Sequence, residues 1–141
     1  GTFAAILSMR REGGMVEEID QLSGLARTNL PMAAVLAALL FSLAGIPPLA
    51  GFWAKWYVFL PAINAGYYEL AVIGVIASVV GAYYYLRIVK IMFFDEAAEP
   101  FSPVPAAIKL IVGLAGAFIV LYVFYPAPLL AAAERAARTF F

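Results

Sequence analysis

Residues 41–61 read "FSLAGIPPLAGFWAKWYVFLP", an almost entirely apolar stretch that contains glycines, prolines and one lysine, Lys55. The stretch lies within a longer apolar run over residues 30–60. As one straight α-helix this run would measure roughly 46 Å, whereas the hydrocarbon core of a bilayer is about 30 Å thick. An interruption within the stretch is therefore expected, and its position decides the fold.

The segment "GIPPLAG", residues 45–51, is where we predict this interruption. The prolines lack an N–H and restrict the residue before them, and the glycines allow the backbone to turn. We predict two half-helices, about 31–44 and about 50–62, joined by a link that is buried in protein or lines a wet cavity, because lipid cannot satisfy free backbone groups. A hairpin or a kinked helix is the alternative. The residues expected to form the break are Gly45, Pro47, Pro48 and Gly51.

The composition identifies the solvent around much of the chain as lipid. The 141 residues are 65% hydrophobic and 13% charged, with a mean hydropathy of +0.95. An ordinary soluble domain is about 45–50% apolar and about 25% charged. A small domain cannot bury such an excess of apolar residues. We therefore predict an all-α integral membrane protein, a bundle of transmembrane helices that includes one discontinuous helix.

Charge and metal-ligating residues limit the partners and cofactors. The formal net charge is zero, so no nucleic-acid partner is predicted. The sequence has no Cys and no His, which excludes disulfides and most zinc, haem and iron–sulfur ligation by these residues. We expect no cofactor-binding and no metal-binding residues in this chain.

The apolar runs and the turn residues between them divide the chain into segments. A transmembrane helix needs about 20 residues, so the short apolar beginning is expected to be the end of a longer helix. We predict the end of a truncated transmembrane helix at 1–9, a loop at 10–29, the broken transmembrane helix at 30–62, transmembrane helices at 67–94 and 106–128 separated by a loop at 95–105, and an interfacial segment at 129–141.

Basic residues orient these segments. In the predicted topology the loops 10–29 and 95–105 lie on the same side. That side receives Arg10, Arg11, Arg27, Arg87, Lys90 and Lys109, whereas the opposite side receives only Arg135 and Arg138. Cytoplasmic loops carry an excess of Lys and Arg. We predict that both loops are cytoplasmic and that the C-terminus lies on the opposite face.

Lys55 is the candidate functional residue. It lies about 7–8 Å beyond the break on the second half-helix. A charge near the centre of a bilayer costs about 2.5–3.5 kcal/mol, and desolvation disfavours the charged form of a lysine. Such a lysine can take up and release a proton, and Ser42 with ordered water could complete a path. Alternatively, Lys55 extends to the outer interface beside Trp53, Trp56 and Tyr57. The residues alone leave both readings open.

Two segments carry a family resemblance. "FSLAGIPPLAGFWAKWYVF" followed by "VIASVVGAYYYLRIVKIMFFDE" resembles the C-terminal helices of the N-subunit family of bacterial proton-pumping NADH:quinone oxidoreductase, respiratory complex I. The resemblance covers nearly the whole chain, from the end of helix 11 through helix 14 of a fourteen-helix subunit. The pattern at the helix break is shared by the wider antiporter-like family, whereas residues 83–87, "YYYLR", are more specific for the N subunit.

The resemblance implies a function for Lys55. In this family the second half of the broken helix carries an ionisable residue, which maps onto Lys55 as a catalytic proton relay. The implied protein is a membrane-arm, antiporter-like subunit that translocates protons coupled to NADH oxidation by quinone. Flavin, iron–sulfur clusters and quinone are expected in other subunits.

The resemblance also implies a location and partners. The expected location is the inner (plasma) membrane of a bacterium, with a multi-pass topology and a periplasmic C-terminus. The expected partners are the other membrane-arm subunits and the lipid bilayer. The alternatives are a subunit of a multi-subunit cation/proton antiporter or membrane-bound hydrogenase, or a purely structural bundle in which Lys55 anchors to the headgroups.

Overall fold

A computed structural model describes residues 1–11, 14–15, 18–96 and 104–139. The described chain is helical except for one antiparallel pair of two-residue strands, β1 (Arg10–Arg11) and β2 (Gly14–Met15). The predicted all-α class is thus confirmed at the level of the whole fold. The helices are α1 (Thr2–Ser8), α2 (Leu25–Thr28), α3 (Leu30–Ala44), α4 (Ala50–Asn64), α5 (Tyr68–Phe94), α6 (Ala106–Phe124) and α7 (Ala127–Ala137), with a 3-10 helix, η1 (Ile19–Leu22).

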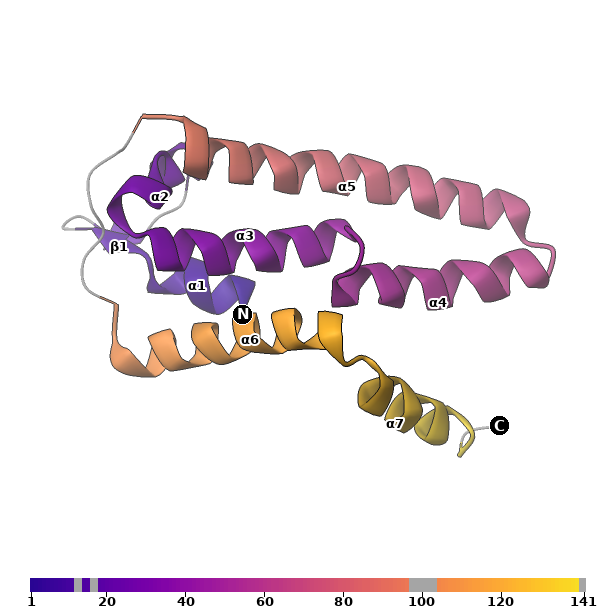
Figure 1. Cartoon of the computed structure of the whole chain (residues 1–141). Coiled ribbons are helices and arrows are strands. Elements are labelled where there is room, and N and C mark those ends of the chain that lie inside the picture. The colour runs from indigo at the N-terminus through magenta and orange to yellow at the C-terminus, as the bar shows by residue number, and fades with distance from the viewer. Residues whose placement is uncertain (12–13, 16–17, 97–103, 140–141) are drawn as a thin grey trace.

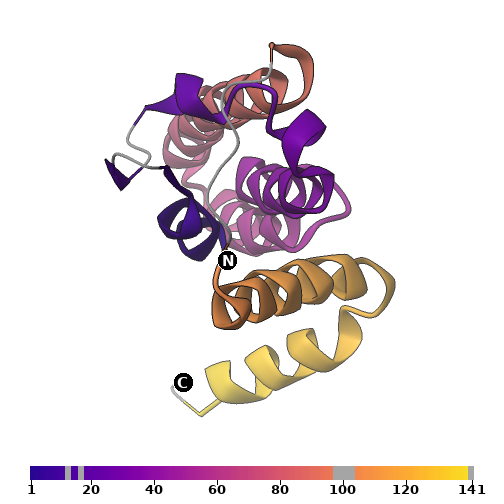
Figure 2. The same ribbon diagram turned by 90° about the vertical axis from the view of Figure 1, so that its left-hand side faces the viewer.

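Helices α3, α4 and α5 form the longest part of the bundle. In Figure 1, α3 and α4 follow one another along the molecule, and α5 returns antiparallel along both. Helix α6 lies along α3 on the side away from α5, and α7 diverges from its end; the view along the bundle in Figure 2 agrees. Helices α5 and α6 are long and apolar enough to cross a membrane, whereas α3 is apolar but shorter.

The predicted loop at 10–29 contains more structure than expected. It holds the strand pair, η1 and α2, and it contributes buried Leu22 and Leu25 to the core. Apolar side chains within a polar segment are the physical reason, because they pack against α3 and α5 while Asp20 and Arg27 stay exposed. The backbone N–H of Gly24 also donates to the Ile91 carbonyl oxygen of α5 (3.1 Å).

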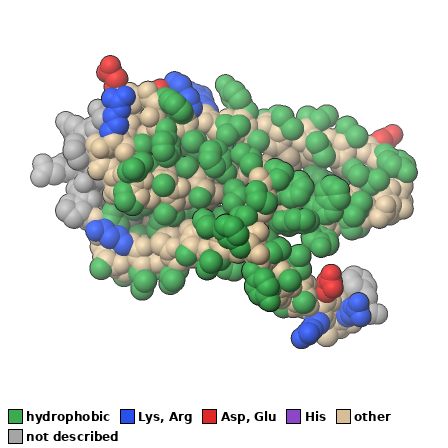
Figure 3. Space-filling model, viewed as in Figure 1, with side chains coloured by type: hydrophobic (Ala, Val, Ile, Leu, Met, Phe, Trp, Pro, Cys, Tyr) green, Lys and Arg blue, Asp and Glu red, His purple; other side chains and the backbone are tan. Residues whose placement is uncertain are grey.

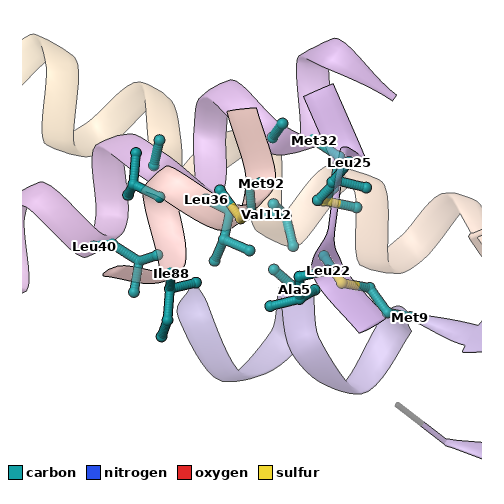
Figure 4. Close-up of a cluster of buried hydrophobic side chains, with 13 residues drawn as sticks. Ala5, Met9, Leu22, Leu25, Met32, Leu36, Leu40, Ile88, Met92 and Val112 are labelled. Atoms are coloured by element: carbon teal, nitrogen blue, oxygen red, sulfur yellow. The ribbon is translucent and has the colours of Figure 1, made fainter. Parts of the chain in front are cut away.

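The buried core lies toward the end of the bundle that holds η1 and α2. Its members come from α1, η1, α2, α3, the C-terminal part of α5 and α6, and Figure 4 labels Ala5, Met9, Leu22, Leu25, Met32, Leu36, Leu40, Ile88, Met92 and Val112. Helix α4, by contrast, has no buried residue. The bundle is therefore tightly packed at one end and open at the other.

Large apolar side chains cover much of the open end. Val58 of α4 and Val79 and Tyr83 of α5 are 65%, 63% and 72% exposed. Figure 3 shows hydrophobic side chains across most of the visible face, with the charged ones toward its ends. A contiguous apolar surface of this extent requires lipid or another protein surface to cover it.

The last two helices differ from the predicted boundaries. The span predicted at 106–128 ends as α6 at Phe124, and α7 starts at Ala127. Pro126 immediately precedes α7, and Pro128 lies in its first turn, where a proline is favoured because that N–H has no helical partner. Helix α4 likewise continues through Pro61 to Asn64, beyond the predicted end at 62.

Candidate functional site

The end of α3 is closed by its own backbone. The N–H of Gly45 donates to the Ser42 carbonyl oxygen (3.0 Å), and the N–H of Ile46 donates to the Phe41 carbonyl oxygen (3.1 Å). This is the bonding pattern of a Schellman motif, which needs a left-handed residue after the helix. Gly45 provides it with a φ of +86°. Helix α3 thus ends at Ala44, directly before Gly45, which is the first glycine of the segment 45–51.

The link between α3 and α4 covers residues 45–49. Pro47 and Pro48 lie in it and are joined by a cis peptide bond. The N–H of Leu49 donates to the Ile46 carbonyl oxygen (3.0 Å), and α4 begins at Ala50. Three of the four predicted break residues, Gly45, Pro47 and Pro48, therefore lie between the helices.

Gly51 lies in the first turn of α4, in contact with α3. Its N–H donates to the Ser42 side-chain oxygen, Oγ, at 3.1 Å. A Cβ at this position would overlap the Ser42 carbonyl oxygen and lie 2.7 Å from the Ser42 carbonyl carbon. The obstructing atoms are backbone, so they cannot rotate away. Only glycine permits the two helices to approach this closely.

Lys55 lies one turn further along α4, and its side chain extends back toward the link. Its ammonium nitrogen, Nζ, donates to the Ala44 carbonyl oxygen at 2.8 Å. The final carbonyl groups of a helix have no intrahelical partner and form the negative end of the helix dipole. The positive charge of Lys55 therefore caps the C-terminus of α3.

Gly45 makes room for this side chain. A Cβ at Gly45 would lie 2.9 Å from Lys55 Cδ and 3.0 Å from Lys55 Nζ. The same glycine thus serves the left-handed backbone and the path of the lysine. Lys55 is partly buried, and among the residues that the structure describes no carboxylate forms an ion pair with it.

A cavity of about 350 Å³ lies beside Lys55, between α4 and α5. Apart from Lys55 its walls are mainly apolar, with Phe52, Trp56 and Phe59 from α4 and Val79 from α5. The ammonium therefore lies between the polar end of α3 and an apolar space. Its one recorded hydrogen-bond acceptor within the described chain is a neutral carbonyl group.

The other basic residues of the sequence analysis lie elsewhere. Lys90 forms an exposed ion pair with Asp95 (2.6 Å) at the C-terminal end of α5. Lys109 is exposed at the start of α6. Within the described ranges no group of three or more His, Cys, Asp or Glu side chains could hold a metal ion.

Sequence reasoning missed how Lys55 is held. The sequence identified Lys55 and placed Ser42 on a proton path, but it assigned no acceptor to the ammonium and no partner to the hydroxyl. The signal was available, because a lysine soon after a helix break can reach the unpaired carbonyls of the preceding helix. The close approach of Gly51 to Ser42 depends on how the chain turns between the two helices and could not be predicted from residue spacing.

Comparison with known proteins places this chain in a family. The family model of the transmembrane region of NADH:quinone oxidoreductase/Mrp antiporter matches residues 1–81. Curated relatives include NADH-quinone oxidoreductase subunit N 1 of Rhizobium meliloti, 59% identical over 100% of this chain and 30% of the relative, and subunit N of Parvibaculum lavamentivorans, 56% identical over 98% of this chain and 29% of the relative.

A solved structure is also similar. A chain of respiratory complex I from Thermus thermophilus with bound aureothin superposes with a TM-score of 0.77 and 31% identity, covering 90% of this chain and 29% of that chain. The chain thus spans only 29% to 30% of the length of these relatives.

Proposed function

Because this chain belongs to the NADH:quinone oxidoreductase/Mrp antiporter transmembrane family, we propose that it forms part of a membrane-arm, antiporter-like subunit of NADH:quinone oxidoreductase. That subunit translocates protons across the membrane, coupled to the oxidation of NADH by quinone. The identity of 56% to 59% to relatives named subunit N supports this choice within the family.

Lys55 is the proton-holding residue in this proposal. The observation that carries the assignment is the bond from Lys55 Nζ to the Ala44 carbonyl oxygen at the helix break, without a carboxylate partner in the described chain. A neutral acceptor stabilises the ammonium, yet loss of the proton leaves no unpaired negative charge behind. A lysine held in this way can both accept and release a proton.

The magnitudes are compatible with a lysine at this depth. A charge near the bilayer centre costs about 2.5–3.5 kcal/mol. A hydrogen bond to a charged group contributes about 1.5–3 kcal/mol, and a favourable helix dipole adds about 0.3–1 kcal/mol. The capping interaction thus offsets most of the cost of placing the ammonium at this depth.

Substitution of Lys55 in the full-length subunit tests this role. Proton pumping is measured in sealed membrane vesicles driven by NADH, and is divided by the amount of assembled complex. We expect Lys55→Ala to lose pumping, and Lys55→Arg to lose it as well, because a guanidinium stays protonated. Pumping retained by Lys55→Arg alone would mean that the charge matters without titration. Wild-type pumping in both variants would refute the assignment.

Helices α3 and α4 together form one discontinuous transmembrane segment in this proposal. Each has 15 residues, about 22 Å of helix, which is too short to cross about 30 Å of hydrocarbon. The link then lies within the membrane, where its polar backbone groups require the protein contacts described above. The segments 10–29 and 95–105 are cytoplasmic and the C-terminus is periplasmic, as the distribution of Lys and Arg predicts.

The redox chemistry belongs to other subunits in this proposal. Iron–sulfur clusters are held by Cys thiolates, with His in some cases, and this sequence contains neither residue. We therefore assign the iron–sulfur clusters to other subunits, and flavin and quinone with them. The exposed faces of α4 and α5 would pack against other membrane-arm subunits and lipid in the bacterial inner membrane.

A second candidate follows from the breadth of the family, whose description includes the Mrp antiporter. In that case the subunit would exchange a cation for protons. Transport that does not respond to NADH but depends on a sodium gradient would favour this function over the first. The same vesicles serve for both measurements.

A further inference from the structure

Ser42 is the buried polar side chain of the described chain, with 6% of its surface exposed. Its Oγ accepts the N–H of Gly51 at 3.1 Å. The first N–H groups of a helix lack intrahelical acceptors, and leaving one unpaired in an apolar place is costly. Ser42 of α3 therefore caps the N-terminus of α4 from outside that helix.

This contact and the Lys55 contact form a reciprocal pair. Ser42 on α3 caps α4, and Lys55 on α4 caps α3 at Ala44. Gly51 and Lys55 are four residues apart, so they lie on the same face of α4. A bond that fixes the Gly51 amide against α3 thereby fixes the point from which the Lys55 side chain leaves α4.

We infer that Ser42 is a positioning residue for Lys55: its hydroxyl holds the first turn of α4 against the last turn of α3, and so brings the ammonium to the Ala44 carbonyl oxygen. This inference rests on the proposed proton-holding role of Lys55. It differs from a relay role for Ser42, because the hydroxyl here holds a backbone amide in place and no proton passes through Ser42. The acting group is the acceptor oxygen of the hydroxyl.

The test compares two substitutions of the same shape, Ser42→Thr and Ser42→Val. Both add volume, but only threonine keeps the hydroxyl. NADH-driven pumping per assembled complex is measured with the full-length subunit in sealed vesicles. We expect Ser42→Thr to pump roughly 2- to 10-fold better than Ser42→Val, the factor that one net hydrogen bond supplies. A purely packing role would affect both variants equally.

Two controls isolate the effect. Thr28→Val removes a hydroxyl that donates to the Leu25 carbonyl oxygen (3.2 Å) just before α3, at the opposite end of that helix from the junction with α4, and pumping should stay near wild type. In a Lys55→Gln background the Thr and Val variants should pump alike, because no ammonium remains to be positioned.

The outcomes separate this inference from the proposed function. Equal pumping by Ser42→Thr and Ser42→Val while Lys55→Ala is defective would overturn the role of Ser42 and leave that of Lys55 intact. A difference between them that persists in the Lys55→Gln background would show that the hydroxyl acts without the lysine, and would also overturn the inference. Wild-type pumping by Lys55→Ala would overturn both.

Discussion

Gly51 shows how one residue can decide the geometry of the junction between α3 and α4. A Cβ at this position meets the backbone of Ser42, which cannot move aside without displacing the end of α3. Both capping bonds depend on that close approach, since the Gly51 amide makes one and Lys55, one turn later, makes the other. The absence of a side chain here is thus as important as the presence of the lysine.

We predict that Gly51→Ala lowers the amount of assembled complex in the membrane. Overpacking of a tight site costs about 1–3 kcal/mol, occasionally more, and this site offers only backbone as the neighbour to displace. The measurement is the quantity of intact complex on a native gel. Gly113→Ala is the matched control, because a Cβ there meets nothing within 4 Å in the described chain. Equal amounts of the two variants would contradict the prediction.

The sequence alone predicts the prolines of the link at this site, but not the hydrogen-bond partners of Lys55 and Ser42. Pro47 and Pro48 lie in the link between α3 and α4, and the effects of proline on a helix are local and independent of the rest of the fold. The position of Lys55 along α4 relative to the link could be counted from them. The acceptor at Ala44 and the hydroxyl contact of Ser42 depend on how two helices meet across a turn, and no spacing rule contains that information.

At the scale of elements, α3 is the helix on which the bundle is built, and its contact with α6 depends on another small residue. A Cβ at Gly116 would lie 2.7 Å from Cγ1 of Val35 on α3. Apolar burial drives little association between helices in lipid, so close packing of this kind supplies much of the contact energy.

We predict that Gly116→Val separates α6 from α3 and lowers the thermal stability of the purified complex, whereas Gly113→Val has a much smaller effect. Both changes add the same side chain to the same helix, but only Gly116 faces a neighbour within the described chain. The temperature at which the complex dissociates in mild detergent reports the difference. A similar loss in both variants would point to helix propensity as the cause.

Element boundaries show a second limit of sequence reasoning. The sequence predicts the end of the second half-helix near residue 62 and the end of the last span at residue 128, whereas α4 continues to Asn64 and α7 has Pro128 in its first turn. Proline disfavours a helix before it and is tolerated in the first turn after it. Which of the two applies depends on what the neighbouring residues pack against, and that is a tertiary property.

For the whole molecule, the distribution of Lys and Arg predicts an orientation in the membrane that can be tested directly. Asp20 is exposed, precedes α2, and belongs to the segment that we assign to the cytoplasm. Thr139 follows α7 and belongs to the segment that we assign to the periplasm. This chain contains no cysteine, so introduced thiols would be the only ones in it.

We predict that Asp20→Cys reacts with a membrane-impermeant maleimide only from the cytoplasmic side, and Thr139→Cys only from the periplasmic side. The experiment compares right-side-out and inverted vesicles carrying the full-length subunit, freed of any other cysteine. Labelling of both thiols from the same side would contradict the proposed topology and, with it, the crossing of the membrane by α3 and α4 together.

The uneven packing of the bundle has a mechanical consequence. The end built on the core of α1, α3, α5 and α6 is stiff, because many side chains there are fully enclosed. Helix α4 has no buried residue. Its N-terminal end is joined to α3 by a five-residue link and two hydrogen bonds. Local displacement needs least free energy where few contacts are lost. A displacement of α4 relative to α3 within the described chain would therefore break these two bonds, one of which is made by Lys55.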